Sequence, residues 1–264
     1  MSAAMRFPLS IRALAAVACL VAASSSTLAQ PIADPLPDLS GTWVEVHVLS
    51  EILSFPIVGR VESTNEGVLL TEIMQTGSAL SLSGRYCAIE VAIESPLAWT
   101  GIPDSFLAAL GEQIRPATVE ASAEGIRFIL DWHAEVSGAR LSDPHTEPLP
   151  RSCDDPRVVD ADGDGHPGVT LLARVLGVIE GEVYVVQRVR YRLVGTLVAP
   201  DRIEGLIEWT GEHVVLGASS PLLAADTPSD PHADPGRSRF VLVRVPPGMT
   251  CEEIRNGWRD LCAR

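Results

Sequence analysis

Apolar and polar side chains alternate along the stretch IRFILDWHAEV, residues 126–136. The even-numbered residues from Ile126 to Val136 are apolar, and the odd-numbered ones are polar or charged, with Ile129 as the exception. Since successive side chains of a strand point to opposite faces, this period of two predicts a half-buried antiparallel strand. Residues 202–209 repeat the pattern.

Other segments share this richness in valine, isoleucine, leucine and aromatic residues, and glycine, proline and acidic clusters separate them. We expect strands at residues 41–49, 67–75, 86–94, 126–136, 169–178, 183–194, 202–216 and 239–245. Strands without alternating helices predict a mostly β protein, an antiparallel β-barrel, with a β-sandwich as the alternative.

Two helices interrupt the predicted strands. A short helix over residues 104–110 begins after Pro103 and ends at Gly111. A C-terminal helix follows Thr250, which forms a capping box with Glu253.

The first 29 residues have the composition of a secretory signal peptide. Their apolar run is too short to span a bilayer, and Thr27-Leu28-Ala29 fits a cleavage site. We expect a single barrel-like domain over residues 30–264, located in the periplasm or outside the cell, and no transmembrane segment in it. A lipoprotein anchored at Cys19 is the alternative.

The composition is acidic, with 20 basic residues against 34 acidic ones and a net charge of −14. Nucleic acid and anionic lipid both require clustered cations, so we expect neither as a partner. Divalent cations would be attracted instead.

Four cysteines follow the predicted signal peptide: Cys87, Cys153, Cys251 and Cys262. An even number in an exported chain predicts two disulfides. Cys251 and Cys262 lie in the predicted helix, about 16 Å apart at ~1.5 Å per residue, which is too far for one bridge. We therefore expect each of them to pair with Cys87 or Cys153.

Gly41-Thr42-Trp43 stands at the start of the first predicted strand. It resembles the Gly-x-Trp entry motif of the lipocalin-like (calycin) β-barrels, and the predicted meander with a C-terminal helix is similar to that group as well. The resemblance implies that Trp43 closes the floor of a barrel whose lumen binds a small apolar ligand. It carries over only to Gly41 and Trp43, because the second motif of the family is missing.

The first predicted strand has two conflicting faces. Glu45 and His47 share the face of Trp43, which the resemblance places inside. The opposite face is more apolar and carries Val44, Val46 and Val48. A β-bulge would reconcile the two faces, and the pattern leaves open which of them is buried.

An acidic insertion over residues 141–168 ends in the run DADGDGHPG, residues 160–168. This run resembles the Asp-x-Asp-x-Asp-Gly loops of dockerin and thrombospondin type 3 repeats, which implies a Ca²⁺ site. The expected ligands are the carboxylates of Asp160, Asp162 and Asp164, the carbonyl of His166, and Asp154 and Asp155 for the remaining oxygens. The alternative is a solvated turn, which aspartate and glycine also favour.

Asp131, His133 and Glu135 are expected to share the polar face of the strand at 126–136. Such a trio can bind a transition metal or orient a histidine as a general base. The alternative is that these residues only form the hydrated face of the strand.

Three arginines, Arg188, Arg190 and Arg192, alternate along one predicted strand. Guanidinium groups in a row suit an anionic ligand. The next strand offers glutamates at the same parity, so we expect cross-strand ion pairs, with Arg192 opposite Glu204 and Arg188 opposite Glu208.

No nucleophile elbow, His-Glu-x-x-His or P-loop motif occurs, and we assign no catalytic residues. The sequence predicts an exported, non-enzymatic binding or interaction protein of the bacterial envelope or exterior, with a small apolar ligand and a Ca²⁺-stabilised loop. A secreted hydrolase with a carboxylate–histidine site and a purely structural envelope protein are the alternatives.

Overall fold

The structure is a computed structural model that describes residues 36–56 and 58–262. The predicted signal peptide and Cys19 lie outside the described residues. These described residues all belong to one compact unit. None of the helices in the described part of the chain has the length and apolar character of a membrane span.

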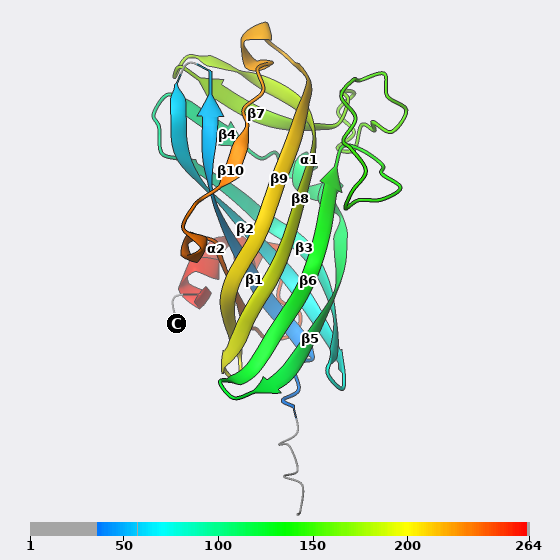
Figure 1. Cartoon of the computed structure of the whole chain (residues 1–264), viewed down its shortest axis with the longest axis vertical. Helices are drawn as coiled ribbons and strands as arrows, with labels where there is room; N and C mark the ends of the chain where they lie inside the picture. Colours follow the sequence, from blue (N-terminus) through cyan, green and yellow to red (C-terminus); the bar gives the residue numbers. More distant parts are fainter. Residues whose placement is uncertain (1–35, 57, 263–264) are drawn as a thin grey trace, which may run out of the picture. The chain divides into compact units, whose positions relative to one another are not determined.

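Eleven strands form one sheet, and all their pairings are antiparallel (Figure 1). They are β1 (Gly41–Phe55), β2 (Gly59–Thr76), β3 (Ala79–Ile93), β4 (Ala98–Gly101), β5 (Glu112–Ser122), β6 (Gly125–Ser137), β7 (Val169–Val175), β8 (Ile179–Ala199), β9 (Arg202–Ala218), β10 (Ser229–Pro231) and β11 (Arg239–Arg244). The helices are α1 (Asp104–Leu110) and α2 (Cys251–Cys262), with short 3-10 turns η1 (Pro221–Leu223) and η2 (Pro235–Arg237).

Eight of these strands close into a ring, in the order β8-β6-β5-β3-β2-β1-β11-β9 and back to β8. Strands β7 and β4 extend the sheet from β8, and β10 pairs with the end of β1. The prediction of a mostly β, antiparallel protein with two helices is therefore confirmed. The capping box of α2 is present, since the Glu253 carboxylate accepts from the Thr250 N–H at 2.8 Å.

Strands β4, β5 and β10 were not predicted. In β5, Pro116 lacks the N–H that a strand interior uses, and the charged Arg115 stands at an inward position. Both features argue against a strand when the sequence is considered alone. The signal available in the sequence was the alternation of the apolar Ala117 and Val119 with the polar Thr118 and Glu120.

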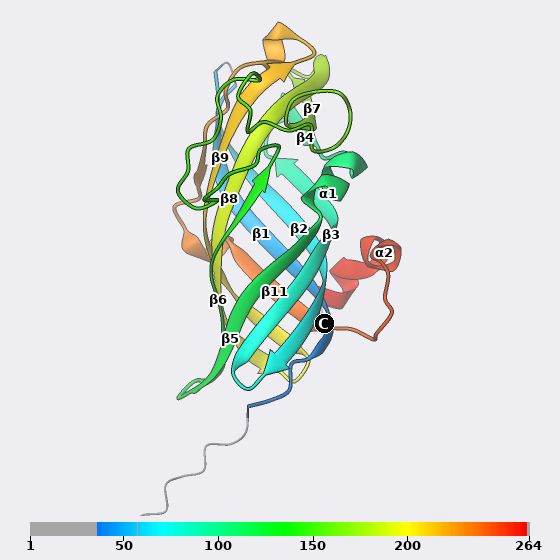
Figure 2. The ribbon, with the colours of Figure 1, turned by 90° about the vertical axis from the view of Figure 1, so that its right-hand side faces the viewer.

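The two conflicting faces of β1 are resolved by α2 rather than by a bulge. The helix α2 lies against the outside of the sheet (Figure 2), and Val44 and Val46 pack with its residues Ile254 and Trp258. The pairing of β1 with β2 and β11 runs without a register shift. Both faces of β1 are thus buried, and Glu45 lies inside.

One of the two expected disulfides is present. Cys87 of β3 is bonded to Cys251 at the start of α2, which confirms one predicted pairing. The prediction of a second disulfide is wrong, because Cys153 and Cys262 are free thiols. Cys153 is exposed in the loop between β6 and β7, whereas Cys262 ends a helix that packs on β2, β3 and β11.

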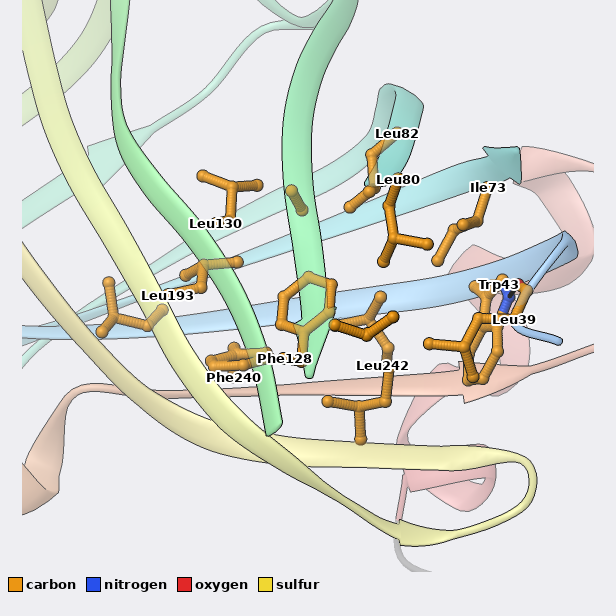
Figure 3. Close-up of a cluster of buried hydrophobic side chains, with 14 of the residues drawn as sticks. Leu39, Trp43, Ile73, Leu80, Leu82, Phe128, Leu130, Leu193, Phe240 and Leu242 are labelled. Atoms are coloured by element: carbon orange, nitrogen blue, oxygen red, sulfur yellow. Dashed lines mark hydrogen bonds between the residues drawn. The ribbon is translucent and has the colours of Figure 1, made fainter. Parts of the chain in front are cut away.

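An apolar core fills one end of the interior (Figure 3). Its members include Leu39, Trp43, Leu82, Phe128, Leu193 and Leu242. The Trp43 side chain is fully buried, its Nε1 donates to the Leu39 carbonyl at 2.9 Å, and the Arg244 guanidinium lies 4.6 Å from the centre of its ring. Beyond this core, towards the Phe55 end of β1, the interior contains polar groups and a cavity.

Candidate functional site

A β-bulge in β6 determines which of its side chains face the interior. The pairing of β6 with β8 shifts by one residue between Leu130 and His133. Asp131 and Trp132 occupy the bulge and stay outside, where the Asp131 side chain is 85% exposed. His133 and Glu135 turn inward after the bulge. The prediction that Asp131, His133 and Glu135 share one face is wrong, because a strict period of two does not survive an inserted residue.

Glu45 and Arg115 form an ion pair that is fully buried. Arg115 donates Nη1 to Glu45 Oε1 at 2.8 Å and Nη2 to Oε2 at 2.7 Å, the strong bidentate geometry. Thr71 Oγ1 donates to Oε2 at 2.9 Å, and His47 Nε2 lies 2.6 Å from Oε1. Burial raises the pKa of Glu45, but the charges of Arg115 and His47 outweigh it and hold this pKa well below its ordinary value.

Gly84 of β3 makes room for the Arg115 guanidinium. A Cβ on Gly84 would lie 2.7 Å from Arg115 Nη2 and 2.9 Å from Thr71 Oγ1. These distances are too short for a carbon atom beside a buried ion pair that cannot shift away. The absence of a side chain at Gly84 is therefore part of the site.

A second carboxylate, Glu135, is held by two tyrosines. Tyr191 donates its hydroxyl to Glu135 Oε1 at 2.7 Å, and Tyr86 donates to Oε2 at 2.9 Å. Arg115 Nη1 lies 3.3 Å from the Tyr191 oxygen and donates to it, so hydrogen bonds connect the two carboxylates. Burial and then the charge of Glu135 raise the pKa of both tyrosines well above the ordinary value, which keeps the hydroxyls protonated as donors.

We call this connected set the polar network. It consists of Glu45, His47, Thr71, Tyr86, Arg115, Glu135 and Tyr191. His133 stands beside it, with its ring edge-on to Tyr191 at a centroid distance of 5.6 Å. The Nε2 atom of His133 is buried without a hydrogen-bond partner, and burial lowers the pKa of this imidazole.

A cavity of about 320 Å³ adjoins the polar network. His47, Tyr86, Glu135 and Tyr191 contribute to its lining. Most of the remaining wall is apolar and includes Leu49, Ile89, Phe106, Leu171, Val185 and Val215. Small-molecule sites have this construction, a volume of roughly 300–1,000 Å³ with apolar walls and a few polar groups.

Glu51 is a further carboxylate in the cavity wall, on the inward face of β1. The residue is only 7% exposed, and Asn65 Nδ2 donates to its Oε1 at 2.7 Å. Burial raises the pKa of Glu51, and side-chain hydrogen bonds from Asn65, Ser229 and Ser63 offset this only in part. Unlike Glu45, it has no arginine or histidine partner among the described residues.

The acidic loop brings three carboxylates together. One oxygen each of Asp160, Asp162 and Asp164 lies within 4.8 Å of the others. Asp160 accepts from backbone N–H groups of the loop at 2.8 and 2.9 Å. Asp162 Oδ2 accepts from the Thr170 N–H at 2.8 Å, but its Oδ1 is buried without a partner. A cation could be held by this cluster.

Asp154 and Asp155, which were also predicted as ligands, are not members of this cluster, whereas the contribution of the His166 carbonyl stays a prediction. Asp155 is paired with Arg157 at 2.7 Å, and Asp154 is exposed. The ring of His166 stacks on Tyr184 at a centroid distance of 4.0 Å.

The arginines of β8 form cross-strand ion pairs, but in another register than predicted. Arg188 pairs with Glu212 and Arg192 with Glu208, four residues further along β9, because the hairpin turns later than expected. Arg188 Nη1 also donates to the Glu147 carbonyl at 2.7 Å, which fastens the acidic insertion to β8.

Sequence reasoning missed several residues of the site, among them Arg115, Tyr86, Tyr191 and Glu51. Glu45 and His47 lie on the same strand face as Trp43, which the lipocalin-like resemblance placed inside. Glu51, six positions after Glu45, lies on that face as well. The tyrosines carry no such signal, because a single tyrosine in a strand is equally suited to an apolar core.

Neither a protein-family model nor a curated protein sequence matches the chain.

Proposed function

We propose that this chain is a non-enzymatic binding protein that holds a small, largely apolar ligand in its interior. The observation that carries this proposal is the cavity of about 320 Å³, with apolar walls and the polar network at one side. A folded protein normally fills its interior with side chains, so an unfilled space next to ordered polar groups favours a ligand.

The ring of eight strands supports the interpretation of the sheet as a closed β-barrel. A barrel of about this strand number has room for one small ligand. The interpretation agrees with the lipocalin-like resemblance at Gly41 and Trp43, in which the tryptophan lies at the closed end and the ligand in the lumen. The competing hydrolase hypothesis depended on Asp131, His133 and Glu135, and Asp131 lies outside the ring.

Binding can be measured with the uncharged dye N-phenyl-1-naphthylamine, whose fluorescence rises in apolar surroundings. We expect a saturable increase with the wild-type protein. Ala173 lines the cavity, so Ala173→Trp should fill it and weaken dye binding by about tenfold or more. Val178→Trp is the matched control, since Val178 is 80% exposed and lies outside the lining. Equal dye binding by both variants would contradict an interior site.

We further propose that the loop at residues 160–168 binds Ca²⁺. The supporting observation is the unpartnered, buried Oδ1 of Asp162, in a cluster of three carboxylates that otherwise repel one another. A bound Ca²⁺ would offset this repulsion and fix the loop to β7, which follows at once. We infer a stabilising role rather than a catalytic one.

Thermal unfolding in Ca²⁺ and in chelator tests this site. At ten millimolar Ca²⁺ we expect a stabilisation of about 1–3 kcal/mol, as for an extracellular site with a Kd of roughly 10⁻⁴ to 10⁻³ M. Asp162→Asn should abolish the gain, whereas Asp154→Asn, which removes an exposed carboxylate outside the cluster, should keep it. An unchanged midpoint with Ca²⁺ in the wild-type protein would refute the proposal.

We propose that the protein works outside the cytoplasm, in the periplasm or the exterior. The Cys87–Cys251 bond supports this location, since structural disulfides persist mainly in oxidising compartments.

A further inference from the structure

We propose that the ligand is an amphipathic amine, an apolar body with one ammonium group that pairs with Glu51 in the cavity wall. This inference rests on the proposed binding function and adds the chemical class of the ligand. It follows from the charges that line the cavity, from the environment of Glu51 and from the aromatic rings of the wall.

The charged groups of the cavity are predominantly acidic. Glu51 and Glu135 both line it, and neither forms an ion pair among the described residues. The arginine of the lining, Arg188, is committed to Glu212 and to two backbone carbonyls. Arg115 is fully buried behind the cavity and is bound bidentately by Glu45. No arginine in the described part of the wall is therefore available for an anionic ligand.

Of the three interior carboxylates, Glu51 has the fewest hydrogen-bond donors and no cationic partner among the described residues. Glu135 receives two tyrosine hydroxyls, and Glu45 receives a guanidinium, a hydroxyl and an imidazole. The neighbours of Glu51 are neutral, with the Asn65 amide donating at 2.7 Å and Ser229 and Ser63 contributing less, and its buried position raises its pKa. A carboxylate left in this state destabilises the folded protein, and an ammonium group beside it would offset the loss of hydration.

Aromatic rings in the wall favour the same kind of ligand. Tyr86, Tyr191 and Trp209 all line the cavity. The faces of such rings carry negative potential and attract ammonium groups, whereas they do not attract carboxylates. The apolar residues of β7 and β8 provide the surface for the rest of the ligand.

The proposal is tested with three ligands that share a ten-carbon skeleton and differ in the polar head group. These are decylamine, decanol and decanoate. Each is used to displace N-phenyl-1-naphthylamine at pH 7 and below its micelle concentration. We expect decylamine to bind about tenfold or more tighter than decanol, because it adds a charge-assisted hydrogen bond in a site of low dielectric constant. Decanoate should bind weakest, since its charge repels those of Glu51 and Glu135.

The variant Glu51→Gln separates the head-group effect from a loss of structure. It should reduce decylamine affinity to that of decanol and leave decanol binding unchanged. It should also raise the unfolding midpoint at neutral pH, because an acid with a raised folded pKa destabilises the native state above that pKa. Glu94→Gln, at an exposed position outside the lining, is the matched control and should keep the preference.

The possible failures are distinguishable. Decanoate binding as tightly as decylamine, or an amine preference that survives Glu51→Gln, would overturn the proposed ligand class and leave the binding function intact. Failure of the dye and of all three ligands to bind would contradict the binding function itself, and the ligand class with it.

Discussion

Replacement of Arg115 by methionine is expected to destabilise the fold by about 3–5 kcal/mol, because it leaves a buried carboxylate without its partner. Glu45 and Arg115 are both fully buried and joined by two hydrogen bonds. Urea unfolding followed by tryptophan fluorescence measures the change. Arg127→Met is the matched control, since the Arg127–Glu120 pair is exposed and should contribute less than about 1 kcal/mol.

A double variant distinguishes an unpaired charge from a general packing defect. Glu45→Leu combined with Arg115→Met removes both charges and should recover most of the lost stability, as apolar replacements of buried ion pairs commonly do. If Arg115→Met alone costs less than about 1 kcal/mol, or if the double variant is the less stable of the two, Arg115 is not needed to compensate the buried charge of Glu45.

The Glu45–Arg115 ion pair also predicts that the stability of the fold depends on pH. Since the folded pKa of Glu45 is lowered, its contribution is complete above the ordinary glutamate pKa of about 4.3 and is lost as the pH falls below that value. In the Arg115→Met variant, the Glu45 carboxyl has lost its guanidinium partner and is protonated more easily. The stability difference between wild type and variant should thus be largest at neutral pH and shrink in acid.

Trp43→Ala is the second change with a large expected effect, also about 3–5 kcal/mol. The side chain is fully buried in the apolar core, and its Nε1 donates to the Leu39 carbonyl. Truncation would leave a large void among the side chains of Figure 3. The control is Trp132→Ala, a tryptophan that is 45% exposed in the β6 bulge.

The Trp43→Ala variant also distinguishes a loss of stability from a loss of ligand binding. It is not part of the cavity lining, so any Trp43→Ala protein that remains folded at low temperature should bind the dye with unchanged affinity. A nearly unchanged unfolding midpoint would contradict the assignment of Trp43 to the core.

The alternation of side chains was sufficient to predict an antiparallel β protein. It did not identify the inner face of a strand where a helix covers the outer face or where a bulge inserts a residue. The apolar Val44 and Val46 left open which face of β1 is the inner one, because α2 covers the outer face as well. The bulge at Asp131 reversed the faces of the second half of β6. Neither effect is encoded in the local pattern of the strand concerned.

The candidate site was harder to predict because its residues come from six strands. The polar network joins residues of β1, β2, β3, β5, β6 and β8. Arg115 and Glu45 are 70 positions apart in the sequence. The acidic loop was recognisable because its three aspartates lie within five consecutive residues.

The most direct test of the central claim, a ligand site inside the ring, is the position of the bound dye. Nuclear Overhauser effects between N-phenyl-1-naphthylamine and methyl-labelled protein report which side chains it touches. We predict contacts with the methyl groups of Leu49, Val183 and Val185, which line the cavity. Contacts confined to the outside of the ring, such as Ile254 of α2, would contradict the claim.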